Sequence, residues 1–248
     1  MSSMQTAGNG ETRLASWAPV AIVARELRKP IGAIRSAMSV MESAAKLPGA
    51  MDQARRLIGR QVGELSVLVD DLLELESLAR GTLRLRRDWI DLVPEVEAAV
   101  SGCSWAFAGH THSLVLQVPD EPVYGYVDPS RLRQVIVNLL DNACRYTRVP
   151  GRVSLRLEHA AREAVVTVAD DGPGISRDRL PHVFDFLHGS PSSTDEASIR
   201  PEIGLAVVRE LVHLHGGSVE ARSAGAGRGS AFIVRWPLGY PLLLPQIP

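Results

Sequence analysis

The sequence predicts an α+β protein, in which a long helical hairpin precedes a domain that mixes helices and strands. Within residues 14–80, apolar residues recur at three- and four-residue steps in two separate runs, as expected for two amphipathic helices. Further along, residues 135–146 have the spacing of a helix, and residues 164–169 alternate in the manner of a half-buried strand. With 248 residues, of which 45% are hydrophobic, the chain can form one medium domain and a smaller second element.

The hairpin is predicted from two apolar stripes separated by a turn. In the first helix the stripe comprises Val20, Leu27, Ile31, Ile34, Met38 and Met41. In the second helix it comprises Leu65, Leu68, Leu72, Leu75 and Ala79. The Leu-Pro-Gly sequence at residues 47–49 ends one helix and turns the chain. Residues 1–13 are mostly small and polar, and we expect them to be disordered.

Two antiparallel helices with one apolar stripe each cannot bury both stripes by themselves. Pairing of residues 14–80 with a second copy of the chain, as a dimeric four-helix bundle, is the expected solution. The alternative is that the hairpin packs back on its own second domain. Residues 81–87 then form a hinge and residues 88–238 the second domain. Residues 239–248 form a tail rich in Pro and Leu, which either covers an apolar groove or trails from the domain.

Two segments of the second domain carry recognisable chemistry. The first is the predicted helix, in which Asn138 and Asn142 lie four residues apart and share one face. The second follows the predicted strand and reads Asp-Asp-Gly-Pro-Gly-Ile at residues 170–175. Amide oxygens are ligands that Mg²⁺ accepts beside phosphate oxygens, and Gly172 and Gly174 allow the backbone to approach a flat ligand. Together the two segments indicate a site for a purine nucleotide and its metal ion.

Further motifs surround these segments at residues 128–134, 184–186, 204–205 and 227–232. With these motifs in order, residues 88–238 resemble the ATP-binding domain of bacterial sensor histidine kinases. That fold is shared with gyrase, mismatch-repair and heat-shock-chaperone ATPases. The resemblance implies an α/β two-layer sandwich, in which helices cover one face of a mixed sheet. It also implies that the nucleotide lies between the helices, beneath a mobile lid.

The resemblance also implies roles for individual residues. The nucleotide-binding residues that it implies are Asn138, Asn142, Arg145, Tyr146, Asp171, Gly172, Gly174, Ile175, Gly204, Leu205 and Ser230. Among them, Asn142 is implied to hold Mg²⁺, and Asp171 to accept the adenine amino group with Ser230 near the same base. Arg145 is implied to face the phosphates and Tyr146 to contact the nucleotide; the alternative is that both are ordinary helix-surface residues.

The position of Asn138 separates two branches of this superfamily. Members that hydrolyse ATP are expected to carry Glu there, as the general base for a water molecule. An amide cannot take a proton at neutral pH, so Asn138 argues against an ATPase. The chain resembles the histidine-kinase branch instead.

The hairpin is similar to the dimerisation and phosphoacceptor domain of the same kinases. Glu26, Leu27, Arg28 and Pro30 match the family's His-Glu-Leu-Arg-Thr-Pro pattern, but Arg25 stands where the phosphoacceptor His is expected. A guanidinium group stays protonated and offers no nucleophilic lone pair, so Arg25 cannot accept a phosphoryl group. Glu26, which assists that His in the family, then has nothing to activate.

Two further departures affect catalysis. Lys29 replaces the small polar residue that the family's phosphatase activity needs, and the glycine-rich lid is reduced to Arg-Pro-Glu at residues 200–202. Pro201 has no N–H to donate, and Glu202 brings negative charge towards a triphosphate, whereas Arg200 could pair with a phosphate. We therefore expect ATP or ADP with Mg²⁺ to bind, with a weakened grip on the triphosphate.

Three hypotheses of function follow. The first is a degenerate histidine kinase of two-component signal transduction, unable to autophosphorylate, that acts as a dimeric regulatory module on a response regulator or an active kinase. The second is a competent kinase that phosphorylates a His of a partner chain in trans. The third is a structural dimer that binds no nucleotide.

Composition narrows the possible partners and compartment. A net charge of −1 provides no basic surface for nucleic acid or a membrane. No apolar run reaches the roughly 20 residues of a membrane span and no signal peptide is found, so a cytoplasmic protein is expected. Cys103 and Cys144 form no metal or redox motif, as expected in a reducing compartment. His213 and His215 are interpreted as capping residues at a helix C-terminus.

Overall fold

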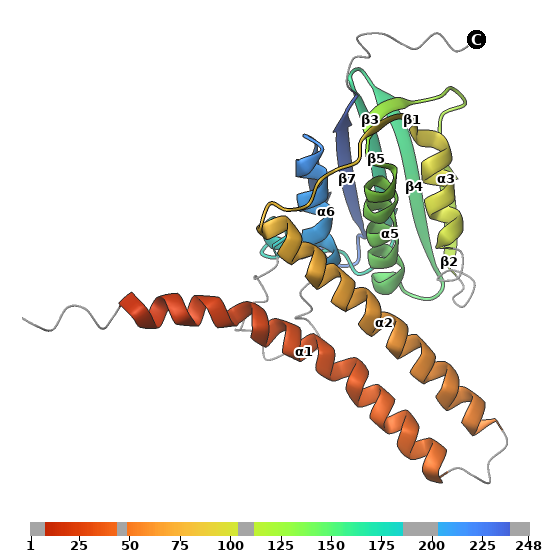
Figure 1. Cartoon of the computed structure of the whole chain (residues 1–248). Coiled ribbons are helices and arrows are strands. Elements are labelled where there is room, and N and C mark those ends of the chain that lie inside the picture. Colours follow the sequence, from red (N-terminus) through yellow and green to blue (C-terminus); the bar gives the residue numbers. More distant parts are fainter. Residues whose placement is uncertain (1–7, 44–48, 104–111, 186–202, 239–248) are drawn as a thin grey trace, which may run out of the picture. The chain divides into compact units, whose positions relative to one another are not determined.

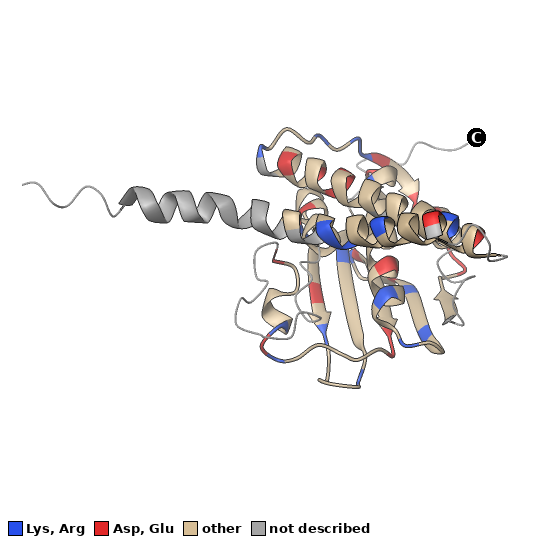
Figure 2. Ribbon diagram, turned by 90° about the horizontal axis from the view of Figure 1, so that it is seen from below, with Lys and Arg blue, Asp and Glu red and all other residues tan. Residues whose placement is uncertain are grey.

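The computed structural model describes residues 8–43, 49–103, 112–185 and 203–238. The chain divides into a helical unit, which runs up to Glu76, and an α/β unit formed by Ser77–Phe184 and the residues from Gly204 onward (Figure 1). Within the described ranges, none of the helices combines the length and the apolar character that a membrane span requires. Basic and acidic residues are interspersed along the ribbon (Figure 2), in keeping with a net charge close to zero.

The helical unit contains two long helices, α1 (Gly8–Ser43) and α2 (Ala50–Ala79). Helix α1 begins six residues before the predicted boundary at residue 14 and runs uninterrupted through Pro30. Residues 8–13 are therefore helical rather than disordered, because a helix extends at little cost once it is nucleated. Ala37 and Ala54 are buried, and residues of both helices line a common groove beside them.

Much of the apolar surface of the helical unit stays in contact with water. The large apolar side chains that are at least two-fifths exposed on the two helices are Ile31, Met38, Val40, Met51, Val62, Val67, Val69 and Leu73. Ile31 and Met38 belong to the stripe predicted for the first helix. The two helices by themselves thus leave part of this stripe uncovered.

The α/β unit is built on a mixed five-stranded sheet with the strand order β2–β4–β5–β7–β6. Strands β2 (His112–Gln117) and β4 (Gly151–Ala160) are parallel. The remaining strands are β5 (Glu163–Asp170), β6 (Ser218–Arg222) and β7 (Ser230–Pro237). The pairs β4–β5, β5–β7 and β7–β6 are antiparallel.

A separate two-stranded ribbon begins the α/β unit. Its strands β1 (Asp88–Asp91) and β3 (Tyr124–Val127) are antiparallel. Strand β1 starts at the first residue predicted for the second domain. The turn before it is closed by Gly81, whose positive φ of 63° suits the end of a helix.

Three helices cover one face of the five-stranded sheet (Figure 1): α3 (Leu92–Gly102), α5 (Pro129–Tyr146) and α6 (Ile203–Leu214). One 3₁₀ turn, η1 (Leu180–His182), follows β5. The prediction of an α+β fold with helices on one face of a mixed sheet is confirmed.

Helix α5 is specified by its own sequence. Asp128 caps its N-terminus, and Pro129 occupies its first turn, where a missing N–H costs nothing. Its buried residues recur at three- and four-residue steps and are Leu132, Val135, Ile136, Leu139, Leu140 and Ala143. This face packs on strands β4 and β5, which leaves Asn138 and Asn142 half-buried beside it.

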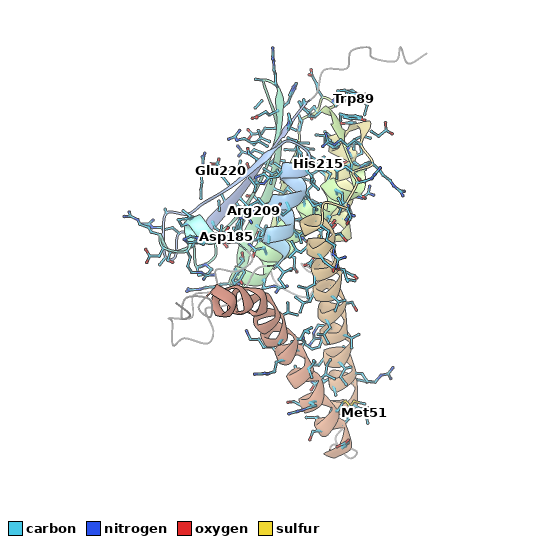
Figure 3. The ribbon with its side chains drawn as sticks, turned by 60° about the vertical axis from the view of Figure 1, so that its left-hand side comes forward. Met51, Trp89, Asp185, Arg209, His215 and Glu220 are labelled. Carbon is cyan, nitrogen blue, oxygen red and sulfur yellow. The ribbon has the colours of Figure 1, made fainter. Side chains whose placement is uncertain are left out.

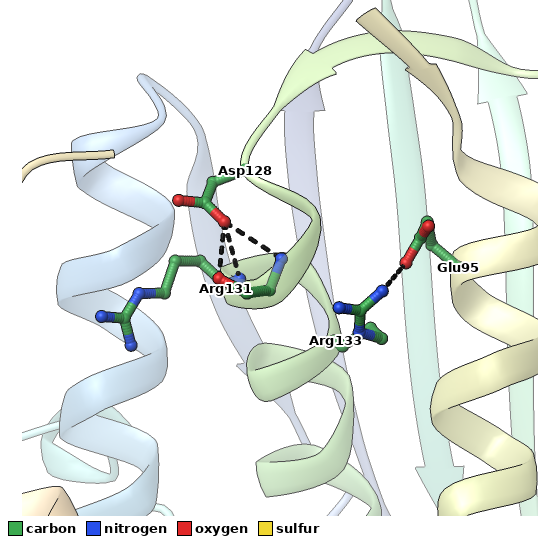
Figure 4. A network of polar contacts seen from close by, with 5 residues as sticks. Glu95, Asp128, Arg131 and Arg133 are labelled. Atoms are coloured by element: carbon green, nitrogen blue, oxygen red, sulfur yellow. Dashed lines mark hydrogen bonds and ion pairs between the residues drawn. The ribbon is translucent and has the colours of Figure 1, made fainter. Parts of the chain in front are cut away.

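A buried polar network joins the start of α5 to the end of α6 and to the hinge. The Asp128 carboxylate accepts hydrogen bonds from the Ser130 hydroxyl at 2.7 Å and from the backbone N–H of Arg86 at 2.7 Å. It also accepts the backbone N–H of Arg131 at 3.3 Å (Figure 4). The Asp128 N–H donates to Nε2 of His215 at 3.1 Å, and Nδ1 of His215 lies 2.7 Å from the Leu211 carbonyl oxygen. Since Nε2 accepts, the proton resides on Nδ1.

This network changes the protonation of both ionisable groups. Burial acts to raise the pKa of Asp128, but hydrogen bonds from Ser130 and the neighbouring backbone outweigh it and lower that pKa. Burial lowers the pKa of His215, and Arg87 adds to this, against opposing contributions from the Leu211 carbonyl and Asp128. His215, at the end of α6 (Figure 3), is therefore a neutral structural residue and not only a helix cap.

Folding stability should consequently depend on pH through His215. The stability that neutral His215 contributes is fully present above the ordinary imidazole pKa of about 6.5. It is lost as the pH falls from there through the lowered pKa of the folded state. Urea unfolding of the native chain should give a smaller free energy of unfolding at about pH 5 than at about pH 8. His215→Gln, which cannot titrate, should lose less; an equal loss in both chains would contradict this role.

Candidate functional site

The two Asn residues of α5 lie on one face, as predicted, and one of them contacts α6. Nδ2 of Asn138 donates to the carbonyl oxygen of Gly204 at 3.3 Å. A Cβ atom at Gly204 would lie 3.5 Å from that same nitrogen, an ordinary van der Waals distance, so the start of α6 lies directly beside Asn138. The amide of Asn142, one turn later, makes no hydrogen bond with any described residue. An amide oxygen at this place is a ligand of the kind that Mg²⁺ accepts.

The carboxylate that lies beside Ser230 belongs to Asp170, not to Asp171. One oxygen of Asp170 accepts from the Gly172 N–H at 2.8 Å, and the other accepts from the Ser230 hydroxyl across the β5–β7 pair. Asp170 shares its strand face with Val166 and Val168, which are at most 1% exposed beneath the helices. Its side chain is thus presented on the helix-covered face of the sheet.

Asp171 is engaged elsewhere. Its Oδ1 accepts the backbone N–H of Arg152, at the start of β4, with a distance of 2.9 Å, and the residue is exposed. The structure therefore does not bring Asp171 together with Ser230, although the sequence analysis assigned both to the base. Side chains alternate between the two faces of a strand, so consecutive residues at its end are directed apart. That alternation in residues 164–169 was the signal that could have selected Asp170.

Glycine residues bring two loops together beside Asp170. The Gly172 carbonyl accepts from the Gly229 N–H at 3.2 Å, and the Pro173 carbonyl accepts from the Gly227 N–H at 2.6 Å. A Cβ atom at Gly172 would lie 3.0 Å from the carbonyl oxygen of Tyr146, so this loop also abuts the end of α5. Ile175, another predicted residue, donates its N–H to the Ser223 hydroxyl at 2.9 Å.

The remaining predicted residues divide into surface, site and core positions. Arg145 is half-exposed and forms an ion pair with Asp141 one turn earlier, at 2.7 Å. Tyr146 is half-buried at the end of α5, beside the Gly172 loop. Leu205 is 1% exposed and belongs to the core beneath α6. Thr147 Oγ1 is the one buried side-chain polar atom without a hydrogen-bond partner in the described part of the chain.

The half-buried amide of Asn142 and the glycine-lined loops beside Asp170 fit a polar, flat ligand with a metal ion. Within the described residues, no three His, Cys, Asp or Glu side chains cluster in a way that could hold a metal alone. A Mg²⁺ ion at Asn142 would therefore depend on ligand oxygens for most of its coordination.

The aromatic motif after β5 has a structural role. Phe184 packs edge-on against Phe232 of β7, with ring centroids 6.0 Å apart. Phe186 and the predicted lid residues Arg200, Pro201 and Glu202 lie outside the described residues. The backbone at Arg25 and Glu26 is helical within α1, but their side chains are likewise outside the described part.

The two Cys residues are unreactive. Burial, with a smaller contribution from the Asp141 carboxylate, raises the pKa of Cys103 to about 11 and that of Cys144 to about 12. Both thiols are free. They are protonated at neutral pH, so neither can act as a nucleophile.

The glycine contacts predict a large difference between two neighbouring positions. Gly227 and Gly229 have similar positive φ values of 72° and 68°, but a Cβ atom meets nothing at Gly227 and would lie 2.0 Å from the Asp170 carbonyl oxygen at Gly229. Gly227→Ala should cost about 1 kcal/mol of unfolding free energy for its backbone conformation alone. Gly229→Ala should cost at least about 3 kcal/mol. Equal losses in chemical denaturation would contradict the close approach.

Comparison with known proteins identifies the domain. Residues 127–240 match the family described as histidine kinase-, DNA gyrase B- and HSP90-like ATPase. The signal transduction histidine-protein kinase AfsQ2 of Streptomyces coelicolor is 31% identical over 230 residues, which cover 88% of this chain and 41% of AfsQ2. The chain thus spans less than half of the length of that relative.

Two solved structures share the fold. Histidine kinase ThkA in complex with the response regulator protein TrrA has a TM-score of 0.66 at 22% identity, covering 92% of this chain and 64% of ThkA. Full-length ShkA in complex with AMPPNP has a TM-score of 0.62 at 23% identity, covering 92% of this chain and 46% of ShkA. The chain belongs to the family of two-component sensor histidine kinases.

Proposed function

We propose that the chain binds an adenine nucleotide with Mg²⁺ and acts as a regulatory dimer that cannot phosphorylate itself. The observation that carries the nucleotide assignment is the Asp170 carboxylate, held between the Gly172 N–H and the Ser230 hydroxyl. A carboxylate accepts hydrogen bonds, so it matches the exocyclic amino group of adenine and is mismatched to the guanine carbonyl. In this proposal Asp170 takes the role that the sequence analysis gave to Asp171.

The neighbouring glycines and amides complete the proposed site. The close-packed loops at Gly172 and Gly229 leave backbone rather than side chains beside the base. Asn142 supplies an amide oxygen to Mg²⁺, which neutralises phosphate charge when it is bound. The side-chain amide of Asn138 donates to the Gly204 carbonyl and is not basic. Asn138 therefore argues against activation of a water molecule for ATP hydrolysis. AMPPNP in the complex of ShkA is consistent with this choice of ligand.

Inability to autophosphorylate rests on Arg25. Phosphoryl transfer to a side chain needs a nucleophilic lone pair, which a protonated guanidinium does not offer. The first His of the chain is His110, which lies outside the helical hairpin. No neighbouring residue of α1 can replace the missing imidazole.

The proposed partners follow from the hairpin. Its exposed apolar residues, Met38 and Leu73 among them, would be buried in a four-helix bundle with a second copy. ThkA binds the response regulator TrrA. By analogy, we assign a response regulator, or an active kinase of the same family, as the partner of this dimer. Two free thiols, one buried and one half-buried, are consistent with the cytoplasm as its compartment.

Nucleotide binding should distinguish the two adjacent carboxylates. Asp170→Asn should weaken the affinity for a fluorescent ADP analogue with Mg²⁺ by at least about tenfold, since it removes a charged hydrogen-bond acceptor from the base. Asp171→Asn, the matched control, should change it by less than about twofold. A larger effect at Asp171, or no saturable binding by the native chain, would contradict the assignment.

The Arg25 proposal has its own test. The native chain should incorporate no label from γ-labelled ATP, and Arg25→His should gain a label that is stable to base and labile to acid, as a phosphohistidine is. Arg25→Lys, which also lacks imidazole, is the control and should stay unlabelled. Labelling of the native chain would overturn the proposal. Label on an added partner kinase that disappears with Asn142→Ala would favour a kinase acting in trans.

A further inference from the structure

One face of the β1–β3 ribbon is aromatic and partly exposed, with Trp89 half-buried between the strands and the solvent. Trp89 lies opposite Tyr126 in the register, and their ring centroids are 5.6 Å apart. Tyr124 lies two residues from Tyr126 and so points to the same side. Tyr124 and Tyr126 are 49% and 45% exposed. Only 5% of the residues are aromatic, so three on one small exposed face are an unusual concentration.

The opposite face of the ribbon is packed. Val127 is 2% exposed, and Gly125 lies against the side chain of Leu92, at the start of α3. The ribbon is therefore half core and half aromatic surface. Trp89 marks its outer side (Figure 3).

The residue that follows β7 lies beside this ribbon, and the C-terminal tail continues from it. The N–H of Leu238 donates to the Arg162 carbonyl at 2.7 Å, which fixes the residue after β7. A Cβ atom at Gly125 would lie 3.3 Å from Cδ2 of Leu238, so that side chain lies against the packed face of β3, opposite to Tyr124 and Tyr126. The tail, residues 239–248, thus begins within contact distance of the ribbon.

The tail has the composition that an aromatic surface accommodates. Its sequence, Gly-Tyr-Pro-Leu-Leu-Leu-Pro-Gln-Ile-Pro, contains three Pro and no charged residue. Pro lacks an N–H, so the tail is poorly suited to add a strand to the sheet, and Pro-rich segments favour an extended polyproline helix. Such helices dock on aromatic side chains. At about 3.1 Å per residue, ten residues reach about 30 Å, against a spacing of about 5 Å between strands.

We propose that residues 239–248 fold back around the ribbon edge and dock on the surface formed by Trp89, Tyr124 and Tyr126. The ribbon begins directly after the hinge at residues 81–87. The docked tail is therefore a strap that ties the last strand of the domain to its first, and it is independent of nucleotide binding at Asp170.

NMR relaxation of the full-length chain tests this proposal. Backbone order parameters of residues 240–247 should approach those of rigid structure, about 0.85, in the native chain. In Tyr124→Ser/Tyr126→Ser they should fall below about 0.6, with the indole N–H signal of Trp89 shifting as its cover is lost. Val115→Ser removes an equally accessible apolar residue from β2 and should leave the tail ordered.

Several results would overturn the proposal. One is a disordered tail in the native chain. Another is a tail that stays ordered in the double Ser variant whose core signals are unchanged, since it would then dock elsewhere. A third is tail order that disappears on dilution, which would assign the surface to the tail of a second copy.

Discussion

The Asp128 carboxylate is the contact on which the geometry of the α/β unit depends. The carboxylate caps α5 and accepts the backbone N–H of Arg86 from the hinge. The backbone N–H of the same residue donates to His215 at the end of α6. One residue thereby sets the start of the helix that carries Asn138 and Asn142, and ties that start to α6, the helix that carries Gly204. Because the network is buried, each unmade bond would leave an unsatisfied polar group, so its parts are retained together or lost together.

The strand β5 supplies the second constraint. Its alternation places Asp170 under the helices and Asp171 on the edge beside Arg152, so one side chain is available to a ligand and the other secures the backbone of β4. The glycine loops then close around Asp170, with backbone approaching to distances that no Cβ atom would allow at Gly229. The recognition chemistry that we propose for this site would thus follow from strand period and backbone packing, with few side chains involved.

Much of the fold was predictable because its signals are local. The apolar spacing of α5, its Asp128 cap and the alternation of β5 are each contained within a short stretch of sequence. The mixed sheet with helices on one face followed from the family resemblance that the ordered motifs carry. The pairing of Asp170 with Ser230, and of Asp128 with His215, joins residues 60 and 87 positions apart, which no local pattern encodes. The choice of Asp171 overlooked the alternation of the preceding strand, which places Asp170 rather than Asp171 beside Ser230.

A structure of the chain with ADP and Mg²⁺ tests the central claim most directly. The account predicts the adenine amino group within hydrogen-bonding distance of the Asp170 carboxylate, the base against the Gly172 loop, and the metal ion on the amide oxygen of Asn142. An amino group bound at Asp171, or a nucleotide bound away from the end of β5, would contradict it.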